Sequence, residues 1–287
     1  MTADGTIRGV VINITEIVKY MVSAHKLDTL AAKALGEAAV GGMLLASAGK
    51  PGERINLNIQ GNARVKQALV DSTPEGAIRG YVILRSDSGP VPDFGLVQGP
   101  WGEGVLSVLR SKDLERQQPY IGTVPLMTGH LAKDLTFYWA QSEQVPSACG
   151  ISVRVSEEGE VMVAGGFLIQ AMPGAQPKDI KKVEARVQSL VGLDDKLAVG
   201  ASPVALLAEL FDGSPFVILE ERPLRFECSC SAERVERALV LVGEQELQSM
   251  HDADHGAVIR CDFCASEYRM DEAQLDRLIA RSRGDSI

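Results

Sequence analysis

The sequence has little basic charge, no export leader and no long apolar run, and each absence removes a class of function. Twenty-nine Lys and Arg residues against 38 Asp and Glu give a net charge of −9, which opposes nucleic acid and anionic membranes as partners. Residues 1–5 show no basic region followed by an apolar core, so we predict no signal peptide. We also find no apolar run of the roughly 20 residues that cross a membrane.

Catalytic signatures are missing as well. The sequence contains no G-x-S-x-G nucleophile turn, no H-E-x-x-H metal helix and no paired His/Asp signature, which argues against a hydrolase. The glycine-rich run 99–104 precedes a predicted strand, whereas a phosphate-binding loop opens a helix, so we interpret this run as a tight turn. These absences leave a hydrolase and a phosphate-binding loop without support in the sequence.

Cysteine is rare, but four of the five cysteines form two close pairs. Cys228 and Cys230 make a C-x-C pair, and Cys261 and Cys264 make a C-x-x-C pair about thirty residues later. Zn²⁺ prefers four thiolates in tetrahedral geometry, and close pairs brought together by folding supply them. Two alternatives are weaker: buried cysteines used as small apolar residues seldom occur as two close pairs, and four thiolates leave no place for a histidine. The nearby histidines, His251 and His255, are then solvated loop residues.

Thiolates are also the groups that oxidants attack. Zinc would hold the four cysteines reduced, whereas an oxidant can take a thiolate through a sulfenic acid to a disulfide with its near neighbour, leaving the metal without ligands. The odd cysteine count and the lack of an export signal predict a cytoplasmic protein, in which thiols stay reduced by default. Oxidation of these pairs would then be a departure from the resting, reduced state, as a redox switch requires.

Periodicity predicts an α+β class with an N-terminal α+β core domain over residues 1–175. A strand at 7–12 precedes a helix from Thr15 that ends at His25, a capping or packing residue, and a second, Ala/Gly-rich helix follows the N-cap Asp28. We predict that the buried face of the first helix carries Ile17, Tyr20, Met21 and Ala24. Alternating segments predict strands at 54–60, 65–70, 77–82 and 105–109, a helix follows at 128–141, and a hairpin spans 151–167 with a break at Gly165-Gly166.

The rest of the chain divides into a linker, residues 176–226, and a zinc-binding redox-switch domain, residues 227–287. In the linker we predict a Lys/Glu-rich helix from Pro177 and a short helix at 202–211. The linker is amphipathic enough to lie on the first domain. In the last domain we predict a helix at 231–242, a short helix after Gly243 and a last helix from Asp271. This domain has too few large apolar side chains to fold well alone. Structural zinc contributes about 10–16 kcal/mol in such small domains. Residues 228–287 carry twelve acidic and seven basic side chains, which disfavours a nucleic-acid-binding zinc ribbon.

At this point the sequence resembles the 33-kilodalton chaperonin family of redox-regulated bacterial holdases, over nearly the whole chain. The spacing of the four cysteines carries the resemblance, supported by Arg79-Gly80-Tyr81, residues 142–146 (SEQVP), residues 164–170 (AGGFLIQ) and Tyr268. The lone Cys149 is outside the family motif, and we expect a small buried residue there.

The resemblance implies a binding protein and not an enzyme. The family members are chaperones that are zinc-bound and inactive when reduced. Upon oxidation such a chaperone forms two disulfides, releases one Zn²⁺ per chain, unfolds its tail and linker, tends to dimerise, and binds unfolding or aggregation-prone client proteins without ATP. Physical reasoning agrees, because zinc closes a long loop, whereas disulfides within each pair close only tiny loops. If the switch works in this way, the disulfides are Cys228–Cys230 and Cys261–Cys264. The alternative is a thiol-disulfide oxidoreductase using Cys261 and Cys264, although this pair does not open a helix after a βαβ unit.

Overall fold

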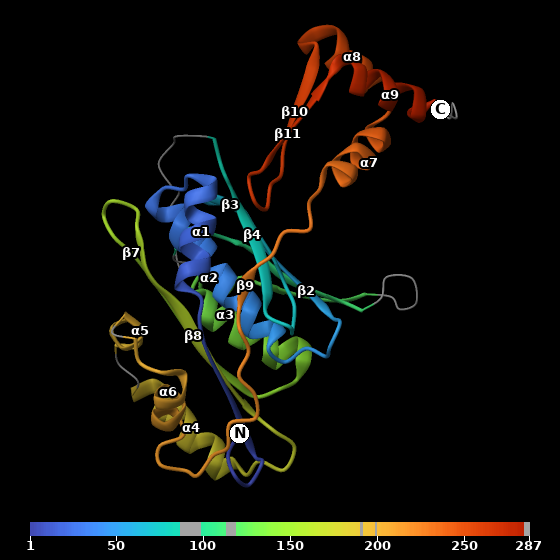
Figure 1. Cartoon of the computed structure of the whole chain (residues 1–287). Coiled ribbons are helices and arrows are strands. Elements are labelled where there is room, and N and C mark those ends of the chain that lie inside the picture. The colour runs from blue at the N-terminus through green and yellow to red at the C-terminus, as the bar shows by residue number, and fades with distance from the viewer. Residues whose placement is uncertain (87–98, 113–118, 190–191, 199, 284–287) are drawn as a thin grey trace. The chain divides into compact units, whose positions relative to one another are not determined.

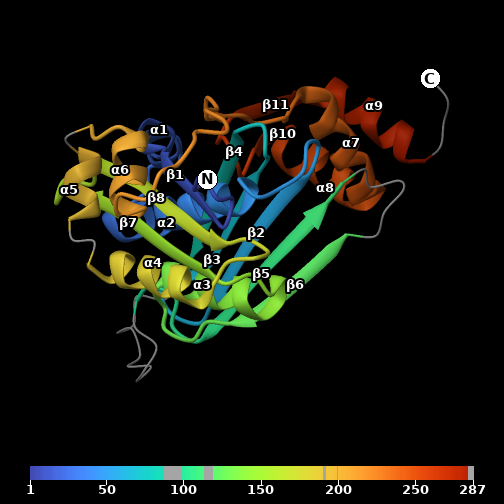
Figure 2. The same cartoon turned by 90° about the horizontal axis from the view of Figure 1, so that it is seen from below.

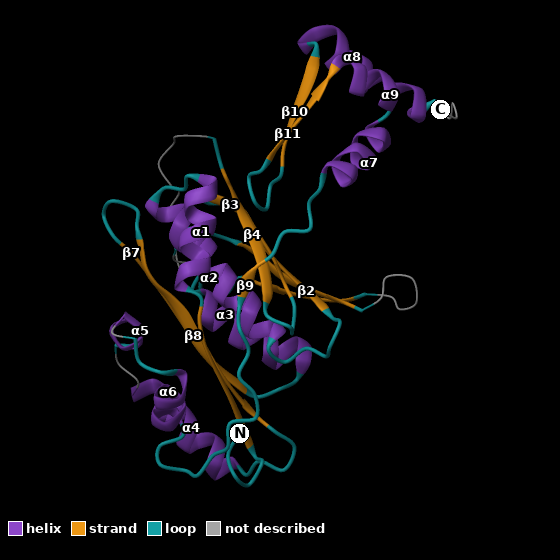
Figure 3. Cartoon of the chain, in the orientation of Figure 1, coloured by secondary structure: helices purple, strands orange, loops and turns teal. Residues whose placement is uncertain are grey.

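The computed structural model describes residues 1–86, 99–112, 119–189, 192–198 and 200–283 (Figure 1). The chain forms two compact units, Met1–Glu227 and Cys228–Ile287. Helices and strands mix in the chain, so the predicted α+β class is confirmed (Figure 3). Each unit is considered separately below.

The larger unit contains two sheets. The three-stranded sheet has the order β1-β8-β7, and the six-stranded sheet has the order β6-β5-β2-β3-β4-β9. Figure 2 shows strands of the larger sheet side by side. The strands are β1 (Ile7–Asn13), β2 (Arg54–Gly61), β3 (Val65–Ser72), β4 (Ala77–Leu84), β5 (Gly104–Ser111), β6 (Tyr120–Pro125), β7 (Ser147–Val155), β8 (Val161–Ala171) and β9 (Arg225–Phe226). Four predicted strands of the larger sheet, β2 to β5, are confirmed, whereas β6 and β9 were not predicted.

Helix α2 (Thr29–Ala46) lies between the two sheets and contacts β2, β3 and β4 on one side and β7 and β8 on the other. Its small residues permit this approach. A Cβ added at Gly36 would lie 2.8 Å from Val153, and one added at Gly42 would lie 2.7 Å from Val70. Asp28 caps the helix by accepting a 2.8 Å hydrogen bond from the Ala31 amide, as predicted. The Ala/Gly-rich sequence is therefore a core helix packed on both faces.

By length and composition α2 is also the one helix among the described residues that reaches the threshold for crossing a membrane, which the sequence analysis did not anticipate. However, 78% of that window is buried inside the larger unit, as is usual for the central helix of a core.

Helix α1 (Thr15–His25) ends at His25 as predicted, but its predicted buried face is partly wrong. Val18, Met21 and Val22 are buried, whereas Tyr20 is 50% exposed. Apolar side chains occur on more than one side of this helix, so two different stripes satisfy the helical period. Packing against β8 and α2 decides which of the two stripes is buried. The Tyr20 ring instead contacts Phe226, with ring centroids 4.7 Å apart.

The predicted break at Gly165-Gly166 is also wrong, because β8 continues through both glycines as the central strand of its sheet. A Cβ at Gly165 would lie 2.6 Å from the Ile12 carbonyl oxygen, and one at Gly166 would lie 2.4 Å from that of Gly150. These glycines serve close packing and not a turn. The run 99–104 is a turn, as predicted, with Gly99 and Gly102 at positive φ.

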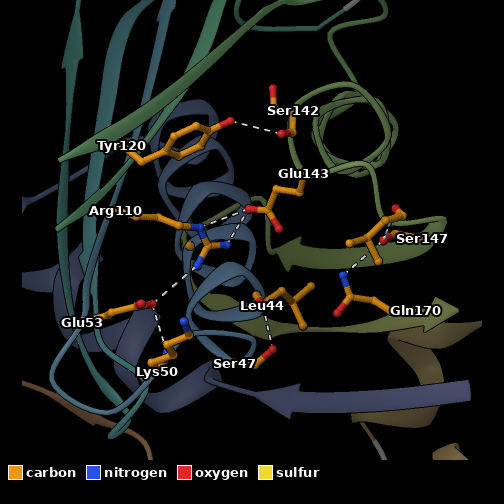
Figure 4. Close-up of polar contacts among 12 residues, drawn as sticks. Leu44, Ser47, Lys50, Glu53, Arg110, Tyr120, Ser142, Glu143, Ser147 and Gln170 are labelled. Atoms are coloured by element: carbon orange, nitrogen blue, oxygen red, sulfur yellow. Dashed lines mark hydrogen bonds and ion pairs between the residues drawn. The ribbon is translucent and has the colours of Figure 1, made fainter. Parts of the chain in front are cut away.

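The helix predicted at 128–141 is observed as α3 (Leu131–Tyr138), which buries Leu131, Leu135 and Tyr138 and continues as a π-helical turn, η1 (Trp139–Glu143). Figure 4 shows that Arg110 from β5 lies between Glu143 and Glu53. The Arg110 guanidinium donates to Glu143 Oε1 from Nε at 3.1 Å and from a terminal nitrogen at 2.6 Å. The Tyr120 hydroxyl donates to the Ser142 carbonyl oxygen at 3.1 Å. The 142–146 motif therefore joins η1 to β5 and β6.

The linker helices are α4 (Pro177–Ser189), α5 (Leu193–Ala198) and α6 (Pro203–Leu210). They belong to the larger unit and cover the face of the three-stranded sheet that α2 leaves open. One apolar cluster joins Ile7, Phe167 and Ile169 of the sheet to Leu207, Leu210 and Phe211, and a second joins Val163 to Leu197 and Leu206. Amphipathic packing of this segment on the first domain was predicted and is observed.

The smaller unit consists of α7 (Ala232–Val242), α8 (Glu244–Asp254), β10 (Gly256–Arg260), β11 (Glu267–Asp271) and α9 (Glu272–Ser282). All three predicted helices of this unit are observed, α7 and α9 with N-caps at Ser231 and Asp271 and α8 directly after Gly243, but the β10–β11 hairpin was not predicted. Its apolar cluster is small, with buried Leu239, Leu247, Met270, Leu275, Leu278 and Ile279. A cluster of this size supplies little stability by itself.

Candidate metal centre

The C-x-x-C pair lies in the connection of the β10–β11 hairpin. The Cys261 amide donates to the Ser266 carbonyl oxygen at 2.9 Å, and the Ala265 amide donates to the Cys261 carbonyl oxygen at 2.8 Å. Ala265 takes the left-handed conformation, with φ of 58°. These bonds close a tight turn that directs both sulfurs to one side.

The C-x-C pair comes from the segment without regular secondary structure just before α7. Ser231 caps that helix through the Arg234 amide, and the Arg234 guanidinium donates back to the Ser229 carbonyl oxygen at 2.7 Å. Cys228 and Cys230 therefore flank a residue whose backbone is fixed by the first turn of α7.

Folding brings the four sulfurs together, all within 4.8 Å of one another. Cys228 Sγ lies 3.7 Å from Cys261 Sγ, and Cys230 Sγ lies 3.3 Å from Cys264 Sγ. Zn–S bonds of about 2.3 Å in a tetrahedron place sulfurs about 3.8 Å apart. The donor set and its spacing therefore fit a tetrahedral thiolate site, and the cluster can hold a metal ion.

The electrostatics of the cluster differ from one sulfur to the next. Burial raises the pKa of the Cys230 thiol to about 12, against the opposing effect of a hydrogen bond from Tyr268. Burial likewise raises the pKa of Cys261. At Cys264 burial is outweighed by hydrogen bonds from the Ser266 side chain and backbone, and the pKa falls to about 7. Four ionised sulfurs this close together require a cation to compensate their charge.

Two residues beside the cluster were not assigned a role by the sequence analysis. The Tyr268 hydroxyl donates to Cys230 Sγ at 3.0 Å, and Ser266 Oγ lies 3.2 Å from Cys264 Sγ. Such partners orient ligands and tune their basicity. Tyr268 had entered only through the family resemblance, since a tyrosine four residues after a C-x-x-C pair carries no signal by itself.

The remaining candidate residues lie apart from the cluster. His255 Nδ1 pairs with Glu272 at 2.6 Å, and His251, which lies in α8 and not in a loop, pairs with Asp252 at 2.9 Å. Cys149 lies on β7 and packs against the main core, but it is half-buried and not fully buried as predicted. Its surroundings still raise the pKa of the thiol by desolvation. His25 is the last residue of α1.

Comparison with known proteins gives one family. The model described as "Hsp33 protein" matches residues 1–271. The 33 kDa chaperonin of Geobacter sp. (strain M21) is 38% identical over 283 residues, covering 96% of this chain and 94% of that protein. The 33 kDa chaperonin of Latilactobacillus sakei is 35% identical over 282 residues, covering 98% and 97%.

A solved structure agrees with these sequence relatives. The crystal structure of the 33 kDa chaperonin (heat shock protein 33 homolog) from Thermotoga maritima is 31% identical and superposes with a TM-score of 0.88, covering 98% of this chain and 96% of that one. The resemblance inferred from the cysteine spacing is confirmed, and the chain belongs to the Hsp33 family of chaperones.

Proposed function

We propose that this protein is a redox-regulated, ATP-independent holdase that is inactive while its four clustered cysteines hold Zn²⁺. The observation that carries the proposal is the cluster itself. Four sulfurs within 4.8 Å join segments about thirty residues apart in a unit with a small apolar core, in a chain of a chaperone family. Cys228, Cys230, Cys261 and Cys264 would be the ligands. The zinc would supply a long-range cross-link between the two segments and keep the thiolates ionised.

Oxidation removes that cross-link. In each pair a thiolate attacks a peroxide oxygen and, with one proton taken from solvent, gives a sulfenic acid and water. The neighbouring thiol then displaces a second water and forms the disulfide, so each pair consumes one peroxide and gives up two electrons. Disulfides within the pairs close loops of only a few residues and restrain the unfolded chain little. The unit from Cys228 onward loses the restraint that compensated for its small apolar cluster.

The linker then becomes the source of binding surface. Its helices rest on the three-stranded sheet through Leu206, Leu207 and Phe211, among others. When the chain beyond Glu227 unfolds, the linker loses its C-terminal anchor, and both its apolar stripe and the sheet face beneath it become available. Contiguous apolar surface of this kind binds unfolded proteins. We place the protein in the cytoplasm, expect a homodimer in the oxidised state, and expect neither nucleic acid nor membrane as a partner.

One experiment tests the proposal directly. Free thiols and bound zinc are counted before and after peroxide treatment, and both samples are tested for suppression of aggregation of a chemically denatured protein. We expect the reduced protein to contain one zinc per chain and to suppress aggregation only weakly. After oxidation we expect four fewer free thiols per chain, no bound zinc and stoichiometric suppression of aggregation. Reduced protein that contains no metal, or oxidised protein that fails to suppress aggregation, would contradict the proposal.

A specific observation supports testing one alternative in parallel. The pKa of Cys264 at about 7 gives it the thiolate character that thiol-disulfide oxidoreductases need. Its C-x-x-C pair, however, lies in a hairpin turn and not at a helix N-terminus. An insulin-reduction assay separates the two functions, because an oxidoreductase turns over and a holdase acts stoichiometrically.

A further inference from the structure

Strand β9 is the end strand of the six-stranded sheet and is held there by few contacts. Its two residues pair with Ala77 and Ile78 of β4. The Arg225 amide donates to the Gly76 carbonyl oxygen at 2.9 Å, and the Glu227 amide donates to the Ile78 carbonyl oxygen at 3.0 Å. This pairing is parallel, whereas the other pairings of that sheet among the described residues are antiparallel. Figure 1 shows β9 alongside β4.

The side chains of the β9 segment follow the pattern of a strand with one buried face. Leu224 and Phe226 pack against the main core, and Arg225 between them is exposed. The Phe226 ring rests on Tyr20 of α1 at a centroid distance of 4.7 Å. The backbone also approaches closely, since a Cβ at Gly76 would lie 2.4 Å from the Pro223 carbonyl oxygen. The site therefore accepts an extended chain with apolar residues two positions apart.

The β4 edge extends beyond the part that β9 covers. The Thr73 amide donates to the Ala77 carbonyl oxygen within the β3–β4 hairpin, so odd-numbered residues of β4 direct their amide and carbonyl groups toward β3. Even-numbered residues direct theirs toward the β9 side, as Ile78 does. The amides of Gly80 and Val82 therefore lie on the same edge as Ile78, beyond the two-residue pairing with β9.

The position of β9 in the chain links it to the metal centre. Cys228 follows Phe226 after a single residue, Glu227. A two-residue strand is too short to remain paired without an ordered chain on both sides. Unfolding from Cys228 onward therefore removes the order that keeps β9 on β4.

We propose that the β4 edge is a strand-addition site for unfolded client proteins, occupied by the chain's own Leu224–Phe226 until the cysteine cluster opens. The partner is an extended segment with apolar side chains at alternate positions, which unfolded proteins carry in abundance. Backbone hydrogen bonds give such a site affinity for any sequence, and the recess filled by Leu224 and Phe226 gives it a preference for apolar residues. This inference rests on the proposed function.

Site-resolved amide exchange tests the proposal in the full chain in three states: reduced with zinc, oxidised, and oxidised with a denatured model protein. We expect the amides of Arg225 and Glu227 to lose protection on oxidation. Client binding should then increase protection of the Ile78, Gly80 and Val82 amides at least tenfold, while Arg225 and Glu227 stay exchangeable. If bound client leaves those three amides unchanged although aggregation is suppressed, the strand-addition site is wrong and the holdase function stands. If oxidation yields no suppression, the proposed function itself fails.

A substitution gives a second, independent arm. Val82→Pro removes the edge-facing amide hydrogen without removing a hydrogen bond to β3, and Val82→Ala loses similar packing but keeps that amide. We expect V82P to bind the denatured model protein at least five-fold more weakly than V82A after oxidation, with equal zinc content before it. Equal affinities of two folded variants would overturn the proposal. If V82P does not fold, the exchange experiment on the unmodified chain decides.

Discussion

The hydroxyl group of Tyr268 lies 3.0 Å from the sulfur of Cys230, so a side chain of β11 hydrogen-bonds to the C-x-C segment. The contact links the two halves of the cysteine cluster. It also stabilises a thiolate that burial disfavours, since burial raises the pKa of Cys230.

Tyr268→Phe should therefore weaken metal retention without changing the fold. Loss of such a partner typically lowers metal affinity about 10- to 100-fold. The measurement is zinc transfer to a chromophoric chelator at increasing concentration. Tyr120→Phe, which removes the hydroxyl that donates to Ser142, is the matched control and should retain zinc like the unmodified chain. Equal retention by Y268F would show that the contact does not support the metal.

Cys264→Ser should abolish tight zinc binding and loosen the chain from residue 176 to the end. We expect rapid proteolysis in that range and measurable suppression of aggregation without oxidant, because the cross-link between the two cysteine pairs is lost. Cys149→Ala is the control, since Cys149 lies on β7 and should leave zinc content unchanged. A C264S chain that resists protease and does not suppress aggregation would disprove the coupling between metal binding and order in the linker.

The disulfides of the oxidised protein should be Cys228–Cys230 and Cys261–Cys264. The folded cluster also brings cross-pair sulfurs to 3.7 Å for Cys228–Cys261 and 3.3 Å for Cys230–Cys264, so geometry alone does not select the pairing. A cross-pair disulfide would close a loop of more than thirty residues and restrain the unfolded unit by about 3–4 kcal/mol, which would blunt the switch. Peptide mapping under non-reducing conditions identifies the pairs. Predominant cross-linking of the 228–230 and 261–264 segments would refute the mechanism.

Glu143→Gln should destabilise the larger unit by about 1–3 kcal/mol. The reason is that the Arg110 guanidinium loses a charged partner that accepts two of its hydrogen bonds. Both tryptophans, Trp101 and Trp139, are buried in this unit, so their fluorescence follows its unfolding in urea. Glu16→Gln removes an exposed ion pair with Lys19 and should cost less than about 1 kcal/mol. Similar decreases in the free energy of unfolding for E143Q and E16Q would show that the Arg110–Glu143 contact stabilises the unit no more than an exposed ion pair does.

Glu37 should give the larger unit a pH-dependent stability. Burial raises the pKa of its carboxyl group above the ordinary value, with Lys33 opposing. The folded state thus holds this proton more tightly than the unfolded state, so the free energy of unfolding falls as pH rises from the ordinary pKa through the raised one. Glu37→Gln should unfold at a higher temperature than the unmodified chain at pH 7, and the difference should vanish at acidic pH, where both states are protonated. A difference that is constant with pH would contradict this assignment.

Local patterns in the sequence determined much of this architecture. Alternation identified β2 to β5, a capped Ala/Gly-rich run identified α2, and the cysteine spacing identified the cluster and, by resemblance, the family. These features depend on neighbours within a few residues, or on a donor set that has one common use, so they can be read without knowing the fold.

Other features were decided only by tertiary structure. The buried stripe of α1 depends on where β8 and α2 lie, and Gly165-Gly166 continues a strand because Ile12 and Gly150 approach it. The pairing of β9 with β4 and the contact of Tyr268 with Cys230 join residues far apart in sequence, and no local pattern records them. Long-range packing selects among conformations that local propensity leaves nearly equal in energy, so the residues that surround and restrain the cysteine cluster emerge only from the folded chain.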